Sequence, residues 1–420
     1  MILQEVGYLE LVVKNGKFRT LWLASIISFL GEWFNFIALF TLIITYTGSE
    51  ALVGTLVAIR MLGFGLLQPI IGLISDRWSR KWIMVYSCGL QVFIALSFLL
   101  VDGKEDMWWM IGLSGLMMLL HGVYITAERA ALPNIVSAEE LATANALTSA
   151  TWSAALAIGA SLGGIVVSQY GTDVAFLIDS VTFLIAALMI VRLQIPQTVS
   201  DDMRRPLLRT AFSNISAGMR RIMADPRVKR IVFAKASWNI AGGGLTGVFL
   251  TLAGSDIEGV EIAAGIGIFF MARGIGTGVG PIVARQVFKD KDRWPSLVGI
   301  LVAFSGVFYA LVSLSLGGDL WLTIVLITIA HAASGANWVL STILTQQWVE
   351  DEMRGRVFST DIVILSGAFV TSALTAGWML ENTNISLENG MLYFALTMIA
   401  VGIAFTMWRP DNRADHSHST

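Results

Sequence analysis

Long apolar runs separated by short polar segments fill almost the whole chain. A helix that crosses the hydrocarbon core of a bilayer needs about 20 apolar residues, and twelve runs have about that length. The first six are expected near residues 20–46, 51–74, 82–101, 107–130, 145–168 and 174–193. The second six are expected near residues 230–253, 262–284, 295–316, 320–343, 357–379 and 390–408. The pattern therefore predicts an all-α polytopic membrane protein with twelve transmembrane helices.

The composition supports this class and excludes several others. Of the 420 residues, 55% are hydrophobic and only 14% are charged, whereas a soluble domain has about 25% charged residues. This excludes a disordered chain, a nucleic-acid-binding protein and an ordinary water-soluble enzyme. The single Cys88 excludes a disulfide framework within the chain and a cysteine-based metal site. No phosphate-binding Gly-Lys-Ser/Thr loop occurs, so neither a cofactor nor nucleotide-driven transport is expected.

Basic residues in the connecting segments predict the orientation of the spans, because Lys and Arg favour cytoplasmic loops. With the N-terminus inside, the outward loops contain one basic residue, Lys104. The inward segments contain Lys14, Lys17, Arg19, Arg77, Arg80, Lys81, Arg192, the basic residues from Arg204 to Arg230, Arg285, Lys289, Lys291, Arg293, Arg354, Arg356, Arg409 and Arg413. We therefore expect both termini in the cytoplasm.

An internal repeat divides the predicted spans into two sets. A shift of 213 residues aligns Arg-x-x-Gly-x-Gly at 60–65 with the same pattern at 273–278, and aligns Gly122 with Gly335. One offset thus places span 2 on span 8 and span 4 on span 10. Two six-helix bundles in parallel repeat are a transporter architecture, in which the substrate path lies between the halves. The expected bundles are residues 1–193 and 230–420.

The polar segment 194–229 connects these bundles. Its stretch from Leu207 to Met223 has apolar residues at roughly helical spacing and arginines elsewhere. We expect a cytoplasmic linker with an amphipathic helix at the membrane boundary. A regulatory role for this helix is the alternative.

The loop between spans 2 and 3 carries the most specific motif. It reads Gly72-Leu-Ile-Ser-Asp76-Arg77-Trp-Ser-Arg80-Lys81 and resembles the loop signature of the major facilitator superfamily. The resemblance implies the major facilitator fold and a gate latch formed by this loop at the inner side. We therefore assign gating roles to Gly72, Asp76, Arg77 and Arg80.

Three further stretches are similar to the bacterial macrolide-efflux and enterobactin-exporter group of drug:proton antiporters. They are Ala131–Leu147, Phe176–Phe183 and Gln346–Ser359. The likeness covers most of the chain and implies a multidrug-type exporter in a bacterial plasma (inner) membrane, expected to be monomeric. Two positions depart from the drug-antiporter pattern: Leu119 replaces a span 4 arginine, and Ala160 replaces a span 5 proline.

Ionisable residues within the spans are the candidates for proton coupling. A charge near the bilayer centre costs at least about 2.5–3.5 kcal/mol, so each one needs a partner or a function. We expect Glu32, Asp179 and His331 to couple transport to protons. A carboxyl group away from water tends to keep its proton, and a central Glu32 can release it when water or a cation arrives. The alternative for Glu32 is a structural ion pair with Arg60 or Arg273.

Packing roles are the alternatives at the other two positions. Asp179 would then be hydrogen-bonded to Ser180 or Thr182, and His331 would link neighbouring helices through a hydrogen bond.

Other side chains within the spans are expected to form the substrate cavity and an inner gate. The cavity residues are Trp33, Phe34, Asn35, Phe36, Arg60, Trp152, Trp238, Arg273 and Trp338. Glu128 and Arg129 lie toward the inner end of span 4, and we expect them to form gate ion pairs with Lys235 or Asp361 across the two bundles.

Together these observations predict a secondary transporter that exports an amphiphilic small molecule by alternating access, with proton antiport. A drug, a macrolide or a siderophore-like molecule would suit the aromatic cavity. The expected partners are this substrate, protons and the lipid bilayer, without nucleic acid. A proton-independent uniporter or importer of lipid-like or nutrient molecules is the alternative that the two departures favour. A membrane receptor or scaffold is a third hypothesis, and an enzyme is not expected.

Overall fold

The computed structural model describes residues 6–197, 206–290 and 293–408. Among the basic residues predicted to face inward, five lie outside these ranges: Arg204, Arg205, Lys291, Arg409 and Arg413.

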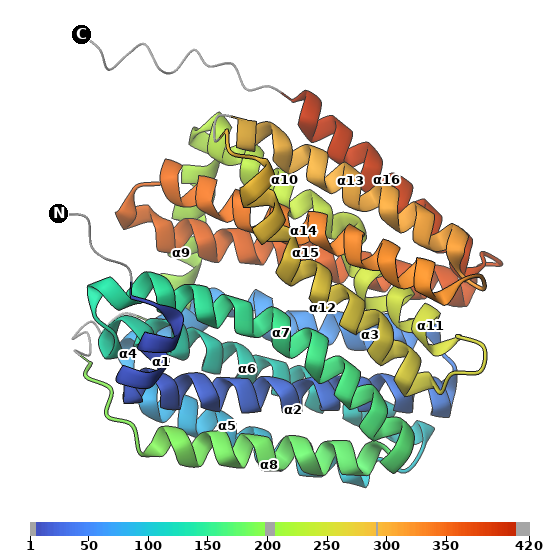
Figure 1. The fold of residues 1–420 in the computed structure, drawn as a ribbon, viewed down its shortest axis with the longest axis horizontal. Coiled ribbons are helices and arrows are strands. Elements are labelled where there is room, and N and C mark those ends of the chain that lie inside the picture. Colours follow the sequence, from blue (N-terminus) through green and yellow to red (C-terminus); the bar gives the residue numbers. More distant parts are fainter. Residues whose placement is uncertain (1–5, 198–205, 291–292, 409–420) are drawn as a thin grey trace.

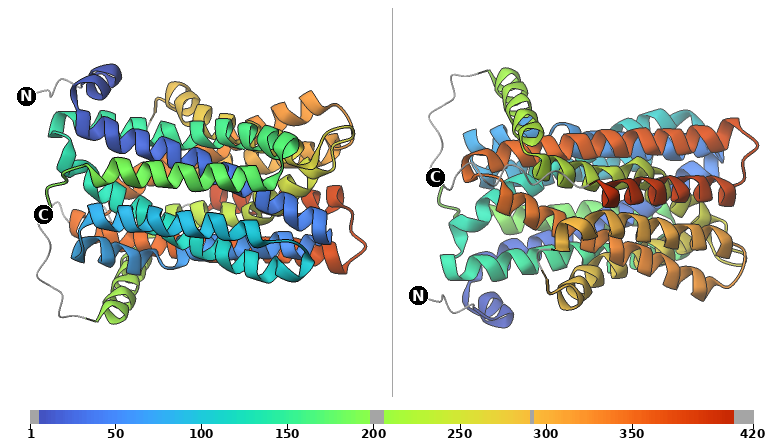
Figure 2. Two further views of the ribbon diagram at one scale, coloured as in Figure 1. Left: turned by 90° about the horizontal axis from the view of Figure 1, so that it is seen from below. Right: turned by 90° about the horizontal axis from the view of Figure 1, so that it is seen from above.

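Nearly all of the described chain is helical, and the helices run along one common axis (Figures 1 and 2). The first half contains α1 (Tyr8–Lys14), α2 (Gly16–Thr47), α3 (Glu50–Met61), η1 (Leu62–Leu66), α4 (Gln68–Arg77), α5 (Arg80–Ser97), η2 (Phe98–Leu100), η3 (Lys104–Asp106), α6 (Met107–Ile135), α7 (Ala138–Tyr170) and α8 (Thr172–Val191). The second half contains α10 (Pro226–Gly243), η4 (Gly244–Phe249), α11 (Leu250–Ser255), α12 (Ile262–Val287), α13 (Trp294–Ser315), α14 (Leu320–Trp348), α15 (Asp351–Asn382) and α16 (Leu387–Met407). Between them lies α9 (Leu207–Ala224).

Apolar helices of membrane-crossing length confirm most of the predicted spans. Ten described helices are long and apolar enough to cross a bilayer, and one bent pair, Glu50–Leu66 with Gln68–Arg77, makes an eleventh span. The bend is 42°. It follows a π-helical turn and precedes Pro69, which has no N–H to continue the helical hydrogen bonds. The predicted span 230–253 corresponds to α10, η4 and α11, and none of these three is among the helices that are long and apolar enough to cross a bilayer. A twelfth crossing therefore remains a prediction.

The two halves share an apolar core at one end of the bundle only. Figure 1 places α1, the first described helix, and α9 at the opposite end, which we call the terminal end. Away from it, one continuous cluster of buried residues joins the two halves, from Phe40 and Val53 to Leu250 and Phe270. At the terminal end the buried residues form separate clusters, one in the first half and two in the second. The halves are therefore closed against each other at the far end and divided at the terminal end.

Glycines allow the two crossings that hold the far end closed. A Cβ at Gly54 on α3 would lie 2.7 Å from the carbonyl oxygen of Ala373 on α15. A Cβ at Gly164 on α7 would lie 2.8 Å from the carbonyl oxygen of Ala263 on α12. Small residues let the helix backbones approach to van der Waals contact at both places.

The amphipathic helix expected in the central linker is present as α9. It packs on α15 and α10 of the second half and on α4 of the first, and it stands at an angle to the bundle at the terminal end (Figure 2). Arg221 holds it there by two hydrogen bonds to the Glu350 carboxylate, at 2.7 and 2.9 Å. The helix thus touches both halves at the end where their cores are divided.

Candidate functional site

An acid in the middle of α2 has two basic neighbours from other helices. Glu32 Oε2 lies 2.9 Å from Nδ1 of His121 on α6, and Oε1 lies 3.5 Å from the Arg60 guanidinium on α3. Arg60 also donates a 2.9 Å hydrogen bond to the Ser114 hydroxyl. The Glu32 side chain is only 15% exposed. The ion pair with Arg60, which was one of the two alternatives for Glu32, is present in the structure, and Glu32 lies inside the protein rather than against lipid.

A second buried acid lies close to this group without a hydrogen bond. Neither carboxylate oxygen of Asp179 on α8, and neither polar atom of the Asn35 amide on α2, has a partner among the described residues. The predicted bond from Asp179 to Ser180 or Thr182 is wrong, because the Thr182 hydroxyl donates to the backbone carbonyl of Asp179 instead. A buried polar group without a partner is costly. Asp179 is therefore a candidate functional group.

Aromatic side chains of the two halves meet in the middle of the bundle. The rings of Phe36 on α2 and Phe270 on α12 have centroids 4.8 Å apart, and Trp33 lies 6.0 Å from Phe270. Arg60 stands 5.5 Å from the Phe36 ring, and Arg273 stands 5.4 Å from the Phe270 ring. These arginines are the pair that the 213-residue repeat aligns. Equivalent positions of the two halves thus hold a cation on each side of one aromatic contact.

Two residues predicted to line the cavity pack elsewhere. A Cβ at Gly163 on α7 would lie 3.0 Å from the ring of Phe34, so this ring fills the contact between α2 and α7. Asn35 is completely buried. Successive residues of an α-helix point about 100° apart, so four consecutive side chains cannot all face one cavity. Only Trp33 and Phe36 of that run reach the second half.

The second half has its own buried polar group. His331 on α14 is 1% exposed, and its Nε2 lies 2.5 Å from the hydroxyl of Tyr309 on α13. The Trp238 and His331 rings meet edge to face, with centroids 6.5 Å apart, and Trp238 Nε1 donates a hydrogen bond to Ser305. His331 and Trp238 therefore lie among α10, α13 and α14. The hydrogen-bonded alternative for His331 fits this arrangement.

Two of the expected gate residues bind each other instead of crossing to the first half. Lys235 Nζ on α10 lies 2.8 Å from Asp361 Oδ2 on α15, and both side chains are buried. The ammonium also lies 3.9 Å from the centre of the Trp338 ring. Trp338 is half exposed, so it covers the ion pair from outside.

The other gate residues border a small cavity in the first half. The buried Glu128 on α6 accepts a 2.5 Å hydrogen bond from Ser25 on α2, so the expected pairs with Lys235 or Asp361 do not form in this arrangement. Arg129 is exposed. The cavity has a volume of about 170 Å³ and lies between α2, α6 and α7. Its lining residues are Phe29, Ile125, Glu128, Arg129, Leu132, Asn145, Thr148, Ser149 and Trp152.

The loop that resembles a gate latch lies at the terminal end of α4 and α5. Asp76 lies 4.0 Å from Arg80. Arg80 Nη1 donates hydrogen bonds to the Ala130 carbonyl at 2.8 Å and to Asn134 Oδ1 at 3.1 Å. Arg77 is buried, and a Cβ at Gly72 would meet open space. The loop is thus fastened to the end of α6 within the first half.

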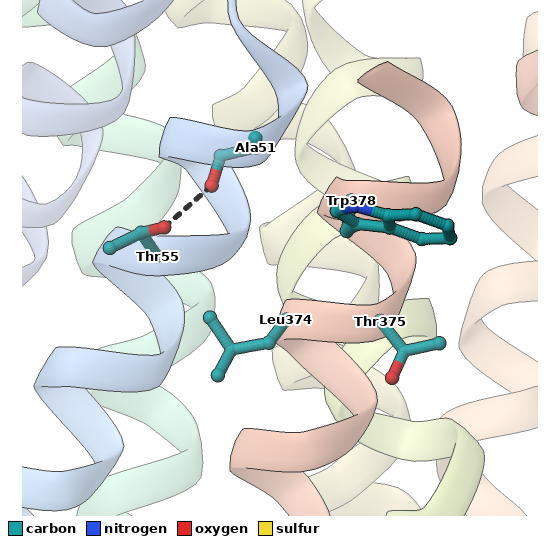
Figure 3. A pocket seen from close by; sticks show the side chains of 5 residues that line it. All are labelled: Ala51, Thr55, Leu374, Thr375 and Trp378. Atoms are coloured by element: carbon teal, nitrogen blue, oxygen red, sulfur yellow. Dashed lines mark hydrogen bonds between the residues drawn. The ribbon is translucent and has the colours of Figure 1, made fainter. Parts of the chain in front are cut away.

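A second pocket lies near the far end of the bundle. It is an open groove of about 440 Å³ between α3 and α15, lined by Ala51, Thr55, Leu374, Thr375 and Trp378. Figure 3 shows Leu374 directed toward α3 and the Thr55 hydroxyl turned to the Ala51 carbonyl, to which it donates a 2.8 Å hydrogen bond. None of these side chains is charged, and the groove borders the Gly54 crossing that closes the far end.

The sequence prediction missed two residues of these groups. His121 lies near the middle of a predicted span, and its imidazole is the only one in the first half of the sequence. That position alone would have marked it as a candidate, because ionisable groups within spans are expensive. Tyr309 carried no comparable signal, because a tyrosine side chain is uncharged near neutral pH.

Comparison with known proteins gives the family. The model of the Major Facilitator Superfamily matches residues 21–317. The uncharacterized MFS-type transporter Rv0037c of Mycobacterium tuberculosis is 22% identical over 342 residues, 76% of this chain and 74% of that protein. The uncharacterized MFS-type transporter YfiS of Bacillus subtilis is 24% identical over 175 residues, 41% of this chain and only 40% of that protein. Membership of the macrolide-efflux and enterobactin-exporter group stays a prediction.

Solved structures share the fold at low identity. The nucleoside transporter NupG superposes with a TM-score of 0.70 at 14% identity, covering 94% of this chain and 100% of that one. A bacterial homologue of the human lysosomal transporter Spinster, in an inward-facing unoccupied conformation, has a TM-score of 0.67 at 16% identity, covering 93% and 95%. The bundle, the family match and these folds agree: the chain belongs to the major facilitator superfamily and is a membrane transporter rather than an enzyme.

Proposed function

We propose that this transporter is a proton antiporter that exports an amphiphilic small molecule by alternating access. One observation carries the proposal: Glu32, in the middle of a span, lies within ion-pair distance of both His121 and Arg60. A carboxylate and an imidazole, together with a fixed cation, are the side chains that proton coupling needs. Under this proposal the monomer lies in a bacterial inner membrane with both termini in the cytoplasm.

The position of Arg60 connects the acid to the interface between the halves. Arg60 stands over Phe36, and Phe36 contacts Phe270 of the other half. When Glu32 is ionised, it holds Arg60 in place; when Glu32 takes a proton, that attraction weakens and Arg60 is released. Protonation thereby acts on the aromatic contact across which the halves must move. The divided terminal end and the closed far end are one of the two states that alternating access requires.

The cavity near Trp152 supports an amphiphilic substrate. Aromatic and aliphatic side chains form one part of its wall, and Asn145, Thr148 and Ser149 form a polar part. Pockets with this mixed lining suit a ligand that has an apolar body and a few hydrogen-bonding groups.

Transport by the purified protein in liposomes tests the proposal. The probes are a cationic dye, a macrolide and a catecholate siderophore, with a pH-sensitive dye sealed inside the vesicles. We expect at least one probe to move against an imposed proton gradient and to drive a proton flux in the opposite direction. Glu32→Gln abolishes the coupled flux, whereas Glu139→Gln, at an exposed position on α7, leaves it intact.

A different result in the same transport assay would refute proton coupling. Probe movement that ignores the pH gradient, with Glu32→Gln as active as the unmodified protein, would refute proton coupling. That outcome supports the second candidate, a uniporter or importer of lipid-like or nutrient molecules. Leu119 and Ala160, which replace residues of the drug-antiporter pattern, favour this candidate.

A further inference from the structure

Cations deep in the described spans differ in whether an acid balances them. Arg60 has Glu32, and Lys235 has Asp361. Within residues 6–197, 206–290 and 293–408, no carboxylate lies within 4.0 Å of the Arg273 guanidinium. Its neighbour there is the Phe270 ring. The repeat thus supplies two equivalent arginines, of which one is neutralised within the protein and the other is not.

The position of Arg273 on α12 directs it into the protein. Ile275 and Val279, which are 43% and 46% exposed, mark the outer face of this helix. Gly276 faces α14, where an added Cβ would lie 2.9 Å from Cβ of His331, and Phe270 faces α2. At about 100° per residue, Arg273 lies between the directions of Gly276 and Phe270. The guanidinium therefore sits toward the middle of the bundle, on the side away from the outer face.

The surroundings of Arg273 suit the anionic end of a ligand. Tyr309 and His331 are close enough for its charge to act on both, and they occupy each other through the contact between the Tyr309 hydroxyl and His331 Nε2. Phe270, with Phe36 from the other half, supplies an adjoining apolar wall. Arg273 is half-buried, and withdrawing a charge from water without a partner is unfavourable. An anion that binds beside the guanidinium therefore gains an attraction that no carboxylate of the described residues supplies.

We propose that Arg273 is an anion-binding subsite, which takes the carboxylate, sulfonate or phosphate group of an amphiphile whose apolar body lies on the Phe36 and Phe270 rings. The guanidinium fork matches the geometry of these oxyanions and binds them through two parallel hydrogen bonds. The inference rests on the proposed function only in that the ligand is a transported amphiphile; it does not depend on protons.

Equilibrium binding of two matched probes tests the subsite. Dansylglycine has a carboxylate, and dansylglycinamide has the same aromatic body without the charge. The purified full chain is placed in nanodiscs of neutral phosphatidylcholine, and energy transfer from its tryptophans to the dansyl group reports binding. We expect the carboxylate probe to bind at least about tenfold more tightly than the amide, as charge-assisted hydrogen bonds predict.

Variants on one helix separate the site from general charge effects. Arg273→Gln is expected to remove the preference for dansylglycine, and Arg273→Lys is expected to restore part of it. Arg285→Gln is the matched control, because Arg285 is an exposed arginine on the same helix. Its binding of both probes should stay unchanged. Equal losses in Arg285→Gln and Arg273→Gln would overturn the proposal.

The affinities of the unmodified protein for the two probes test the subsite even if a variant does not fold. Equal affinity for the two probes, or no binding of either up to the solubility limit, overturns the anion subsite. Displacement of dansylglycine by phosphatidylglycerol in the nanodisc assigns the subsite to a lipid headgroup, and retention assigns it to a dissolved organic anion. Because no pH gradient is present, failure here leaves the proton-coupling result untouched.

Discussion

The buried pair of Lys235 and Asp361 allows a sharp test of what holds the second half together. The two charged atoms lie 2.8 Å apart and the side chains are 6% and 2% exposed, so water screens them little. At an effective dielectric constant of about 20, their attraction is about 6 kcal/mol. Most of this offsets the cost of removing both charges from water. Removing one member of the pair is expected to lower the stability strongly, because the other charge then stays buried without a partner.

We therefore expect strongly non-additive substitutions. Lys235→Met and Asp361→Leu should each destabilise the protein by about 3–5 kcal/mol, whereas the double variant should come close to the original stability or exceed it. At the 2–4 °C per kcal/mol typical of domains near the size of one half, each single variant would lose about 6–20 °C. Asp351→Leu is the matched control on α15, because Asp351 is 90% exposed and pairs with Arg354 at the surface, where ion pairs contribute little.

The chain provides its own reporter for this measurement. Cys88 is the only cysteine and is completely buried, so a fluorogenic maleimide labels the protein only as it unfolds. The readout is the temperature of half-maximal labelling for the original protein, the two single variants and the double variant. Losses that simply add in the double variant would refute the reasoning, because the charges would then not be coupled.

Three other perturbations test other parts of the structure. Gly54→Val, whose Cβ would collide with the Ala373 carbonyl, should lower the temperature of half-maximal Cys88 labelling. Gly72→Val, whose Cβ meets open space, should not, and equal temperatures for the two variants would contradict the tight crossing. The Arg221 guanidinium holds the pKa of the Glu350 carboxyl below its usual value, so their bond is present at neutral pH and is lost as the pH falls through that lowered pKa. The fluorescence anisotropy of a dye on Ser213→Cys in α9 should therefore fall in acid, and Glu350→Gln should show the low value already at pH 7; a pH response that survives this substitution would exclude Glu350 as its cause. Tyr309→Phe removes the hydrogen-bond partner of His331 and should lower the free energy of unfolding by about 1 kcal/mol, measured by Cys88 labelling. Tyr393→Phe, at an exposed position, should leave the free energy of unfolding unchanged. Equal losses in the two variants would show that the buried contact does not stabilise the protein.

The pattern of apolar residues alone predicted most of the architecture. The hydrocarbon core imposes a length on each span, and a chain that must bury its backbone polar groups in lipid has few structures available. The positions of most helices and the amphipathic α9 followed from this constraint, whereas the sequence left both Arg60 and Arg273 open as partners of Glu32. The expected span at 230–253 contains Lys235 and the run Gly242–Gly244, and its helices are not among those long and apolar enough to cross a bilayer.

Tertiary packing decided which polar residues meet. His121 is 89 residues from Glu32 in the sequence, and only the crossing of α2 and α6 brings them to 2.9 Å. In the same way, packing brings Lys235 into an ion pair with Asp361, whereas no carboxylate of the described residues pairs with Arg273. Hydropathy specifies which segments enter the membrane, because each residue contributes separately to transfer from water. The partners of a buried charge depend instead on helix rotation and contact between distant segments, which no local pattern contains.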